Sequence, residues 1–151
     1  MDITIRKAEE RDAATLAAMI AELFSIERDF VPAPEKHEAG IRGILARGQD
    51  AAAFVAEDAA GEAVGMVTVQ LVISTAEGGP SGLLEDLFVR QDARRGGAAT
   101  ALVDAVEAWC RSRGATRVQL LADEGNGGAL RFYDRRGYGP TSMVCRRRYL
   151  A

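Results

Sequence analysis

The sequence predicts an α/β protein in which helices cover both faces of a mixed β-sheet. Two observations lead to this class. Short apolar segments with alternating polarity are interspersed with longer segments of helical periodicity. Some successive strands are joined by short turns and others by a helix, so hairpins and a β-α-β unit occur in one chain. This combination requires a mixed sheet, and its apolar faces need helices to cover them.

The first third of the chain predicts one strand and two helices. Residues 3–6 alternate apolar and polar side chains, which indicates a short strand. Asp12 can cap the first helix, which ends before the prolines of residues 31–34. A second helix is expected over residues 35–47. The apolar stripe of the first helix comprises Leu16, Met19, Ile20, Leu23 and Phe24.

The middle third predicts strands. Residues 52–57 and 63–73 form an expected hairpin, with Val67 and Val69 on one face of the second strand and Thr68 on the other. A glycine-rich loop is expected over residues 74–82, followed by a strand over residues 83–89.

The last third predicts two helices and two strands. The helix that carries Leu102, Val106 and Trp109 ends at Gly114. A strand is expected over residues 117–121 and a final strand over residues 143–150. Between them, Asn126 can cap a helix that runs through Arg136.

Bulk properties favour one soluble globular domain over residues 1–151, with 48% hydrophobic and 27% charged residues. A net charge of −3 argues against a general nucleic-acid partner. We expect a cytoplasmic protein without a membrane partner, because the chain shows neither a signal-peptide core nor an apolar run of about 20 residues.

Cysteine and histidine usage points away from metal chemistry. Cys110 and Cys145 are far apart in the sequence and are expected to be buried free thiols. The single histidine, His37, lies near a predicted helix start, where we expect it to be exposed. No metal is therefore expected.

The most informative segment lies between the strand at residues 83–89 and the following helix. Residues 94–100 read Arg-Arg-Gly-Gly-Ala-Ala-Thr. Exposed backbone N–H groups and the helix dipole make such a junction an anion site. Gly96 and Gly97 leave room for a phosphate and permit positive φ.

Three motifs in register resemble the GNAT family of N-acetyltransferases, and order and spacing agree from about Ile3 to the C-terminus. One motif would be weak evidence, whereas three in register are strong. In chain order they are Glu85-Asp86-Leu87-Phe88-Val89, Arg94-x-x-Gly97-x-Ala99, and Asn126-x-x-Ala129-x-x-Phe132-Tyr133-x-x-x-Gly137-Tyr138.

The resemblance implies a twisted, mostly antiparallel sheet of six to seven strands and acetyl-CoA as cosubstrate. The backbone of Leu87, Phe88 and Val89 would pair with the pantetheine arm. Asn126, Phe132 and Tyr133 would contact the cofactor, although Asn126 can also simply cap its helix. The pyrophosphate would lie against Arg94, Arg95, Gly96, Gly97, Ala98, Ala99 and Thr100. The chain departs from the family at Gly96, often basic, and at Ala99, more usually glycine.

The resemblance also implies catalytic roles. Tyr133 would be the general acid that returns a proton to the leaving thiolate, although a core tyrosine is the structural alternative. Glu85 would be the general base for the amine, with Asp86 as the other candidate. Because adjacent strand residues point to opposite faces, only one of the two carboxylates is expected to face the cleft.

The expected activity is acetyl transfer from acetyl-CoA to a primary amine by direct attack in a ternary complex. The alternative is a catalytically inactive CoA-binding sensor or regulatory module of the same fold. The acceptor is left open between polyamines, aminoglycosides, amino acids, other small amines and protein N-termini. A homodimer is expected by resemblance.

Overall fold

The computed structural model describes residues 2–27 and 29–151. The chain divides into two compact units, residues 1–119 and residues 120–151. The first unit contains most of the sheet and three long helices, and the second contains one shorter helix. A single functional domain over the whole chain stays a prediction.

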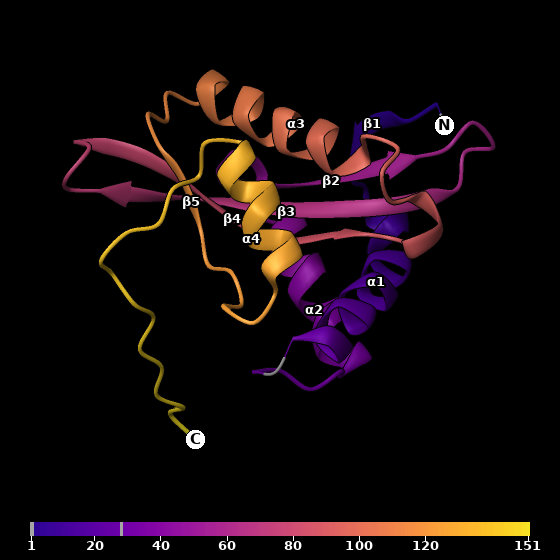
Figure 1. The fold of residues 1–151 in the computed structure, drawn as a ribbon, viewed down its shortest axis with the longest axis horizontal. Coiled ribbons are helices and arrows are strands. Elements are labelled where there is room, and N and C mark those ends of the chain that lie inside the picture. The colour runs from indigo at the N-terminus through magenta and orange to yellow at the C-terminus, as the bar shows by residue number, and fades with distance from the viewer. Residues whose placement is uncertain (1, 28) are drawn as a thin grey trace. The chain divides into compact units, whose positions relative to one another are not determined.

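One five-stranded sheet organises the first unit, with its strands side by side in chain order (Figure 1). The first four strands pair antiparallel in succession. The strands are β1 (Thr4–Lys7), β2 (Ala51–Glu57), β3 (Ala63–Ser74), β4 (Gly79–Val89) and β5 (Val118–Leu120). The predicted α/β class with a mostly antiparallel sheet is confirmed, with five strands in place of six to seven.

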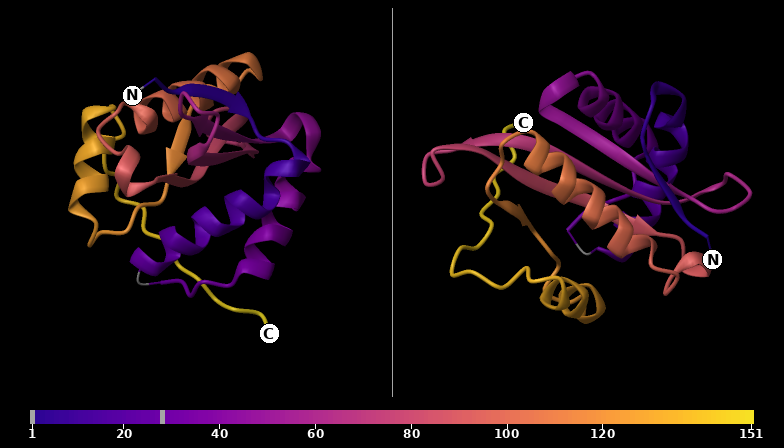
Figure 2. Two further views of the ribbon diagram at one scale, coloured as in Figure 1. Left: turned by 90° about the vertical axis from the view of Figure 1, so that its right-hand side faces the viewer. Right: turned by 90° about the horizontal axis from the view of Figure 1, so that it is seen from above.

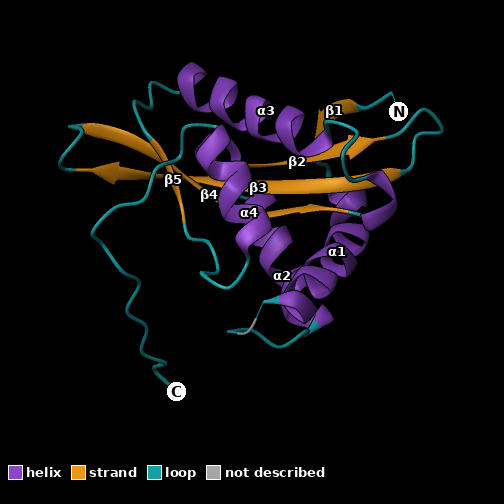
Figure 3. Ribbon diagram, viewed as in Figure 1, coloured by secondary structure: helices purple, strands orange, loops and turns teal. Residues whose placement is uncertain are grey.

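Helices cover both faces of this sheet. Figure 2 shows α3 on one side of the strands and the pair α1 and α2 on the other, and Figure 3 shows the strands between them. Their bounds are α1 (Ala13–Ile26), α2 (Pro34–Leu45) and α3 (Ala98–Ser112). Short 3₁₀ turns occur at Glu10–Asp12, Gly48–Asp50 and Gln91–Ala93.

Apolar side chains on each face explain why these elements pack. On the buried face of α3, the side chains of Leu102, Val103 and Val106 are all completely buried. A β-carbon at Gly65 would lie 3.0 Å from the Phe88 carbonyl oxygen and 3.3 Å from Leu102 Cδ1, so a glycine lets α3 approach the sheet closely. The core under α1 and α2 comprises Ala13, Leu16, Met19, Ile20, Ile41, Ala53, Val55, Met66 and Phe88.

The expected loop over residues 74–82 is instead a long hairpin. β3 continues to Ser74 and β4 begins at Gly79, so only residues 75–78 turn. Gly78 supplies the left-handed conformation of this turn with a φ of 77°. The Ser74 side chain accepts a hydrogen bond from the Glu77 backbone N–H at 3.1 Å and closes the turn.

The second unit contains α4 (Gly127–Arg135), and residues 138–151 contain neither helix nor strand. The predicted strand over residues 143–150 is therefore wrong. Met143, Val144, Tyr149 and Leu150 are each at least 74% exposed. Alternating polarity favours an extended conformation, but a strand also needs a neighbouring strand to pair with, and none of the strands in the described residues pairs with this segment.

The two thiols differ in their surroundings. Cys110 is buried and free, as predicted, and burial raises the pKa of its thiol to about 11. Cys145 is free but exposed, so the expectation of a buried thiol there is wrong. None of the helices in the described ranges has both the length and the apolar character needed to cross a bilayer.

Candidate functional site

The turn between β4 and α3 forms one part of the candidate site. Gly97 occupies the N-cap position of α3 with a φ of 86°, and Arg95 has a φ of 68°. Of the two glycines expected to permit positive φ, Gly97 adopts it and Gly96 does not, whereas Arg95 does. Ala98, the first helical residue, is 1% exposed, which fixes the start of α3 against the core.

Backbone donors are exposed along this turn. Within the described ranges, the N–H groups of residues 95–100 donate to no backbone carbonyl, and the first bond at the start of α3 runs from Ala101 N–H to Gly97 O at 3.0 Å. Unengaged N–H groups at a helix N-terminus, together with the helix dipole, provide a site for an anion such as a pyrophosphate.

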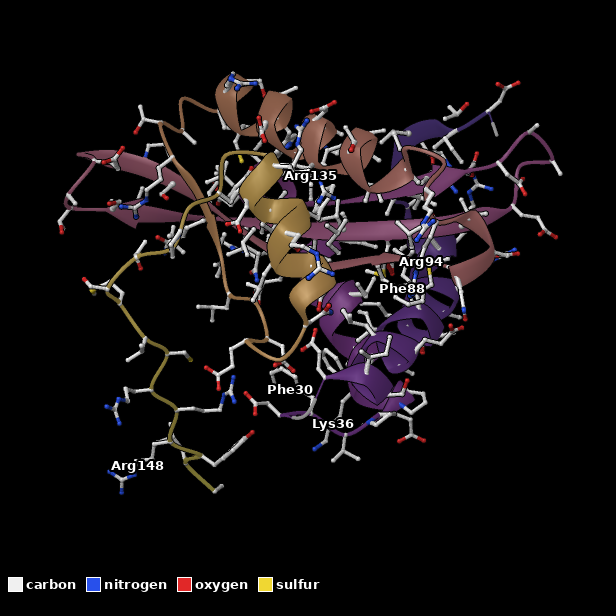
Figure 4. The ribbon with its side chains drawn as sticks, in the orientation of Figure 1. Phe30, Lys36, Phe88, Arg94, Arg135 and Arg148 are labelled. Atoms are coloured by element: carbon white, nitrogen blue, oxygen red, sulfur yellow. The ribbon has the colours of Figure 1, made fainter. Side chains whose placement is uncertain are left out.

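Arg94 ties this turn to the end of β4. Its Nε–H donates to the Val89 carbonyl oxygen at 2.9 Å, and its guanidinium lies 6.0 Å from the centroid of the Phe88 ring. Figure 4 shows the labelled side chains of Arg94, from the turn, and Phe88, from β4, near one another. Arg94 therefore stabilises the turn in this structure, and its predicted contact with a cofactor stays a prediction.

The end of β4 has an edge that β5 does not cover. β5 meets β4 near Gly82, whose N–H donates to the Arg117 carbonyl oxygen at 2.8 Å. Because β5 is only three residues long, Leu87, Phe88 and Val89 lie beyond its reach. The Phe88 and Val89 side chains are buried, so the backbone is what this edge offers a ligand.

A bulge in β4 brings two carboxylates to one face. The register shifts between Met66 and Thr68, and Asp86 has a φ of 53°. Thr68 lies opposite Glu85 in the register, and its hydroxyl also donates to Asp86 Oδ2 at 2.9 Å. Both carboxylates therefore lie on the face of Thr68, and the expectation that they point to opposite faces is wrong.

The surroundings of Glu85 and Asp86 raise the pKa of both carboxyl groups. Burial raises the pKa of the Asp86 carboxyl, against the opposing effects of the Thr68 hydrogen bond and of the charge of His37. Glu85 is exposed as a residue, yet partial desolvation of its carboxyl and, second, the negative charge of Asp86 raise its pKa. A base with a raised pKa lies closer to the range in which it can take up protons from an amine.

Sequence reasoning missed two neighbours of these carboxylates. Thr68, predicted only as a polar strand position, is 1% exposed and supports Asp86. His37 is half-buried rather than exposed, and its ring contacts the Phe24 ring edge-on with centroids 4.9 Å apart. Its Nε2 accepts the Ala33 N–H at 2.8 Å. A hydroxyl residue between the apolar residues Val67 and Val69 was the signal that could have indicated Thr68.

The remaining candidate residues lie in the second unit. The Asn126 side chain accepts the Ala129 N–H at 3.1 Å, so its expected capping role is confirmed. Phe132 and Tyr133 are half-buried in α4 with ring centroids 5.4 Å apart. The Tyr133 ring also contacts the Tyr138 ring edge-on at 6.1 Å, and the Tyr138 N–H donates to the Tyr133 carbonyl oxygen.

The first unit therefore brings together Glu85, Asp86, the β4 edge and the turn of residues 94–100 along one continuous stretch of chain. The second unit holds Asn126, Phe132 and Tyr133 within or beside one helix. No group of three or more histidine, cysteine, aspartate or glutamate side chains suited to a metal ion occurs among residues 2–27 and 29–151.

Comparison with known proteins agrees with this geometry. Residues 18–138 match the family described as "Acetyltransferase (GNAT) family". The chain is 30% identical over 114 residues to aminoglycoside N(6')-acetyltransferase type 1 of Serratia marcescens, covering 74% of this chain and 77% of that protein.

Solved structures share the fold over nearly the whole chain. A transcriptional regulator from Bacillus halodurans C-125 matches with a TM-score of 0.83 and 26% identity, covering 98% of this chain and 100% of that one. The structure of AAC(6')-Iy in complex with the bisubstrate analogue CoA-S-monomethyl-acetylneamine matches with a TM-score of 0.81 and 21% identity, covering all of both chains.

Proposed function

Because the chain belongs to the acetyltransferase (GNAT) family, we propose that it transfers the acetyl group of acetyl-CoA to a primary amine by direct attack in a ternary complex. The observation that carries this proposal is the run of unengaged N–H groups over residues 95–100 at the start of α3. Such a run suits the pyrophosphate of coenzyme A, which needs backbone donors more than a dedicated cation.

The cosubstrate would follow the end of β4. The pyrophosphate would lie against Arg94, Arg95, Gly96, Gly97, Ala98, Ala99 and Thr100. The pantetheine amides would pair with the backbone of Leu87, Phe88 and Val89, as an extended ligand adds to an open strand edge. Asn126, Phe132 and Tyr133 would complete the contacts. The open space around Gly97 supports this arrangement, because no atom lies within 4 Å of where its β-carbon would be.

The chemistry would need one base and one acid. The incoming amine is mostly protonated near neutral pH, since a lysine-type amine has a pKa of about 10.4. Glu85 would take that proton, directly or through water. The neutral nitrogen would attack the thioester carbonyl, so that a C–N bond forms and the C–S bond breaks. The Tyr133 hydroxyl would protonate the departing thiolate.

Relatives guide the choice of acceptor. The curated relative acts on aminoglycosides by name, and the AAC(6')-Iy complex carries an acetylneamine analogue. We therefore rank aminoglycosides first among acceptors, ahead of polyamines, amino acids and protein N-termini. A net charge of −3 is compatible with a cationic acceptor.

An amine panel tests the proposal. The purified protein is incubated with acetyl-CoA and, in turn, neamine, spermidine, glucosamine 6-phosphate and an N-terminal peptide, while thiol release and product mass are measured. We expect thiol release that depends on the amine and one acetyl group added to it. If the protein binds coenzyme A but releases no thiol from acetyl-CoA with any of the amines, the sensor alternative is favoured. No coenzyme A binding would reject the proposal.

We further propose that the chain acts as one domain and as a homodimer. Matched structures that span 98% or more of this chain support the single domain. Sedimentation velocity at several concentrations tests the dimer, which would be rejected by a monomer mass throughout.

A further inference from the structure

The end of β3 that precedes the hairpin turn has an open edge. β2 begins at Ala51, opposite Gln70, and no strand of the described residues pairs with β3 beyond that point on the same side. Figure 1 shows the β3–β4 hairpin extending past β2. Residues 71–74 therefore have β4 on one side only, and this open edge contains no charged residue or proline that would discourage a further strand from pairing.

Backbone groups on the open edge point away from β4. Leu71 lies opposite Gly82, whose N–H donates to the Arg117 carbonyl oxygen on the other side of β4. In an antiparallel pair, residues that bond each other alternate with residues that both point outward. Leu71 and Ile73 therefore direct their N–H and C=O groups to the open side. Ile73 is 78% exposed and Val72 is 45% exposed, so the edge also presents apolar side chains.

Buried polar contacts hold this end of the hairpin in place. Arg117 donates from Nε to Ser81 Oγ at 3.2 Å and from Nη2 to Ser74 Oγ at 3.4 Å. The Thr116 hydroxyl donates to Glu77 Oε1 at 2.8 Å. Both serines are buried. An edge that is already ordered loses little conformational entropy when a further strand pairs with it, which favours binding.

The two ends of the open edge carry opposite charges. At one end the exposed Arg47 donates to Gln70 Oε1 at 3.0 Å, which directs its guanidinium toward β3. At the other end Glu77 is exposed in the turn. Neither residue belongs to an ion pair within the described ranges. Asp50 lies at the same end as Arg47, but its side chain forms no hydrogen bond to β3 in the part of the chain described. A strand edge with a positive and a negative end is complementary to a second copy that runs in the opposite direction.

We propose that the open edge of β3 pairs antiparallel with the same edge of a second copy, around a two-fold axis at Ile73. In this register the two Ile73 residues face each other, and Gln70 of each copy lies opposite residue 76 of the other. Arg47 of each copy then lies beside Glu77 of the other. The inference rests on the proposed homodimer, to which it gives an interface, and it is independent of the proposed acetyl transfer.

Ile73→Lys tests the centre of the interface. The two-fold axis brings the two added ammonium groups together, so we expect the Kd of the dimer to rise by about 100-fold or more. Sedimentation velocity over a range of concentrations measures it. Val31→Lys is the matched control, because Val31 is 81% exposed between α1 and α2 and the variant adds the same charge away from the edge. Its Kd should equal that of the wild type. Thermal melts show whether each variant is folded.

An exchange of the end charges tests the register. Arg47→Glu and Glu77→Arg each bring like charges together between the copies, and each should raise the Kd about 10-fold. The double variant places opposite charges together again and should return the Kd toward the wild-type value. Because the two residues form no ion pair within one chain, the recovery is expected only from a contact between copies.

The outcomes separate this interface from the other proposals. A wild type that stays monomeric at every concentration overturns both the homodimer and the interface, whatever the result of the amine panel. A dimer that Ile73→Lys leaves intact, or charge variants that fail to compensate each other, overturn the interface while the homodimer stands. If Ile73→Lys does not fold, the exchange of charges decides alone. A dimer that is lost in the single variants and recovered in the double variant supports the interface.

Discussion

The Sγ atom of Cys110 on α3 occupies the space that a side chain at Gly82 of β4 would need. A β-carbon at Gly82 would lie 2.6 Å from this sulfur, well inside van der Waals contact. The glycine thus sets how closely α3 packs on the sheet next to the β4–β5 junction. Since the proposed anion site lies at the start of the same helix, this packing also supports the candidate site.

Gly82→Ala should destabilise the protein by about 1–3 kcal/mol, because overpacking forces the helix or the strand to shift. Urea unfolding followed by circular dichroism measures the change. Cys110→Ala is the matched partner, since it removes the sulfur that the new methyl group would meet. The double variant should be more stable than the sum of the two single effects predicts. Strict additivity would show that the two positions do not compete for space.

Gly97→Val should abolish coenzyme A binding. At a φ of 86° a β-branched residue is strained, and its side chain would fill the space beside the N–H groups of residues 95–100. Calorimetric titration with coenzyme A measures the loss. Gly61→Val is the matched control, because Gly61 has a φ of 81° and equally open surroundings in the β2–β3 turn. Equal loss of binding in both variants would indicate general misfolding, and normal affinity in a folded Gly97→Val would contradict the anion site.

Tyr133→Phe should lower kcat by about 10- to 10⁴-fold while coenzyme A affinity changes little, because only the proton donor is removed. Stopped-flow or steady-state thiol release measures the rate. Tyr138→Phe is the control, since Tyr138 contacts the Tyr133 ring and loses the same hydroxyl group. If the two variants keep equal, near wild-type rates, Tyr133 is not the general acid.

The periodicity of apolar residues predicted most strands and helices of the first unit, because its helices bury one face and expose the other. Residues 52–57 and 63–73 alternate as a half-buried hairpin should, and β2 and β3 match these ranges within one residue. Alternation failed at residues 143–150, where the same pattern occurs but the strands that the structure describes do not pair with it. Sequence pattern reports side-chain preference, whereas a strand also requires a second chain segment beside it.

The site was harder to predict than the fold for a similar reason. The opposite-face assignment of Glu85 and Asp86 assumed an uninterrupted strand, but a bulge adds a residue to β4 and breaks the alternation. Aspartate is among the residues that tolerate positive φ, so Asp86 can adopt the bulge conformation. An aspartate in a strand sequence does not by itself indicate a bulge. The contact from Thr68 depends on strand register, which spacing along one strand cannot reveal.

Glu85→Gln should reduce activity most at the lower end of the pH range, where the free amine is scarce and a base is most needed. Burial and the charge of Asp86 raise the pKa of Glu85, so the wild-type rate should fall as the pH drops through a value above the ordinary 4.5. A profile of kcat/KM against pH for neamine measures both effects. A reduction that is constant across pH would indicate a packing role in place of proton transfer.

Asp12 and Asp86 should change stability in opposite directions when each is replaced by asparagine. The hydrogen bond from Arg6 is the largest of the effects that lower the pKa of Asp12, so its ionised form stabilises the fold above the ordinary value of 3.8 and that contribution disappears as the pH falls through the lowered pKa. Asp12→Asn should therefore cost about 1–3 kcal/mol at pH 7, where the Arg6 guanidinium loses its partner.

Burial raises the pKa of Asp86, so its ionisation costs stability as the pH rises above 3.8, and Asp86→Asn should unfold at a higher urea concentration than the wild type at pH 7. Urea unfolding at pH 7 and again near pH 4 measures both changes, and the gain from Asp86→Asn should shrink at the lower pH because the wild-type carboxyl is then protonated. A less stable Asp86→Asn at pH 7 would mean that the Thr68 hydrogen bond and the charge of His37 outweigh the cost of burying the ionised carboxylate.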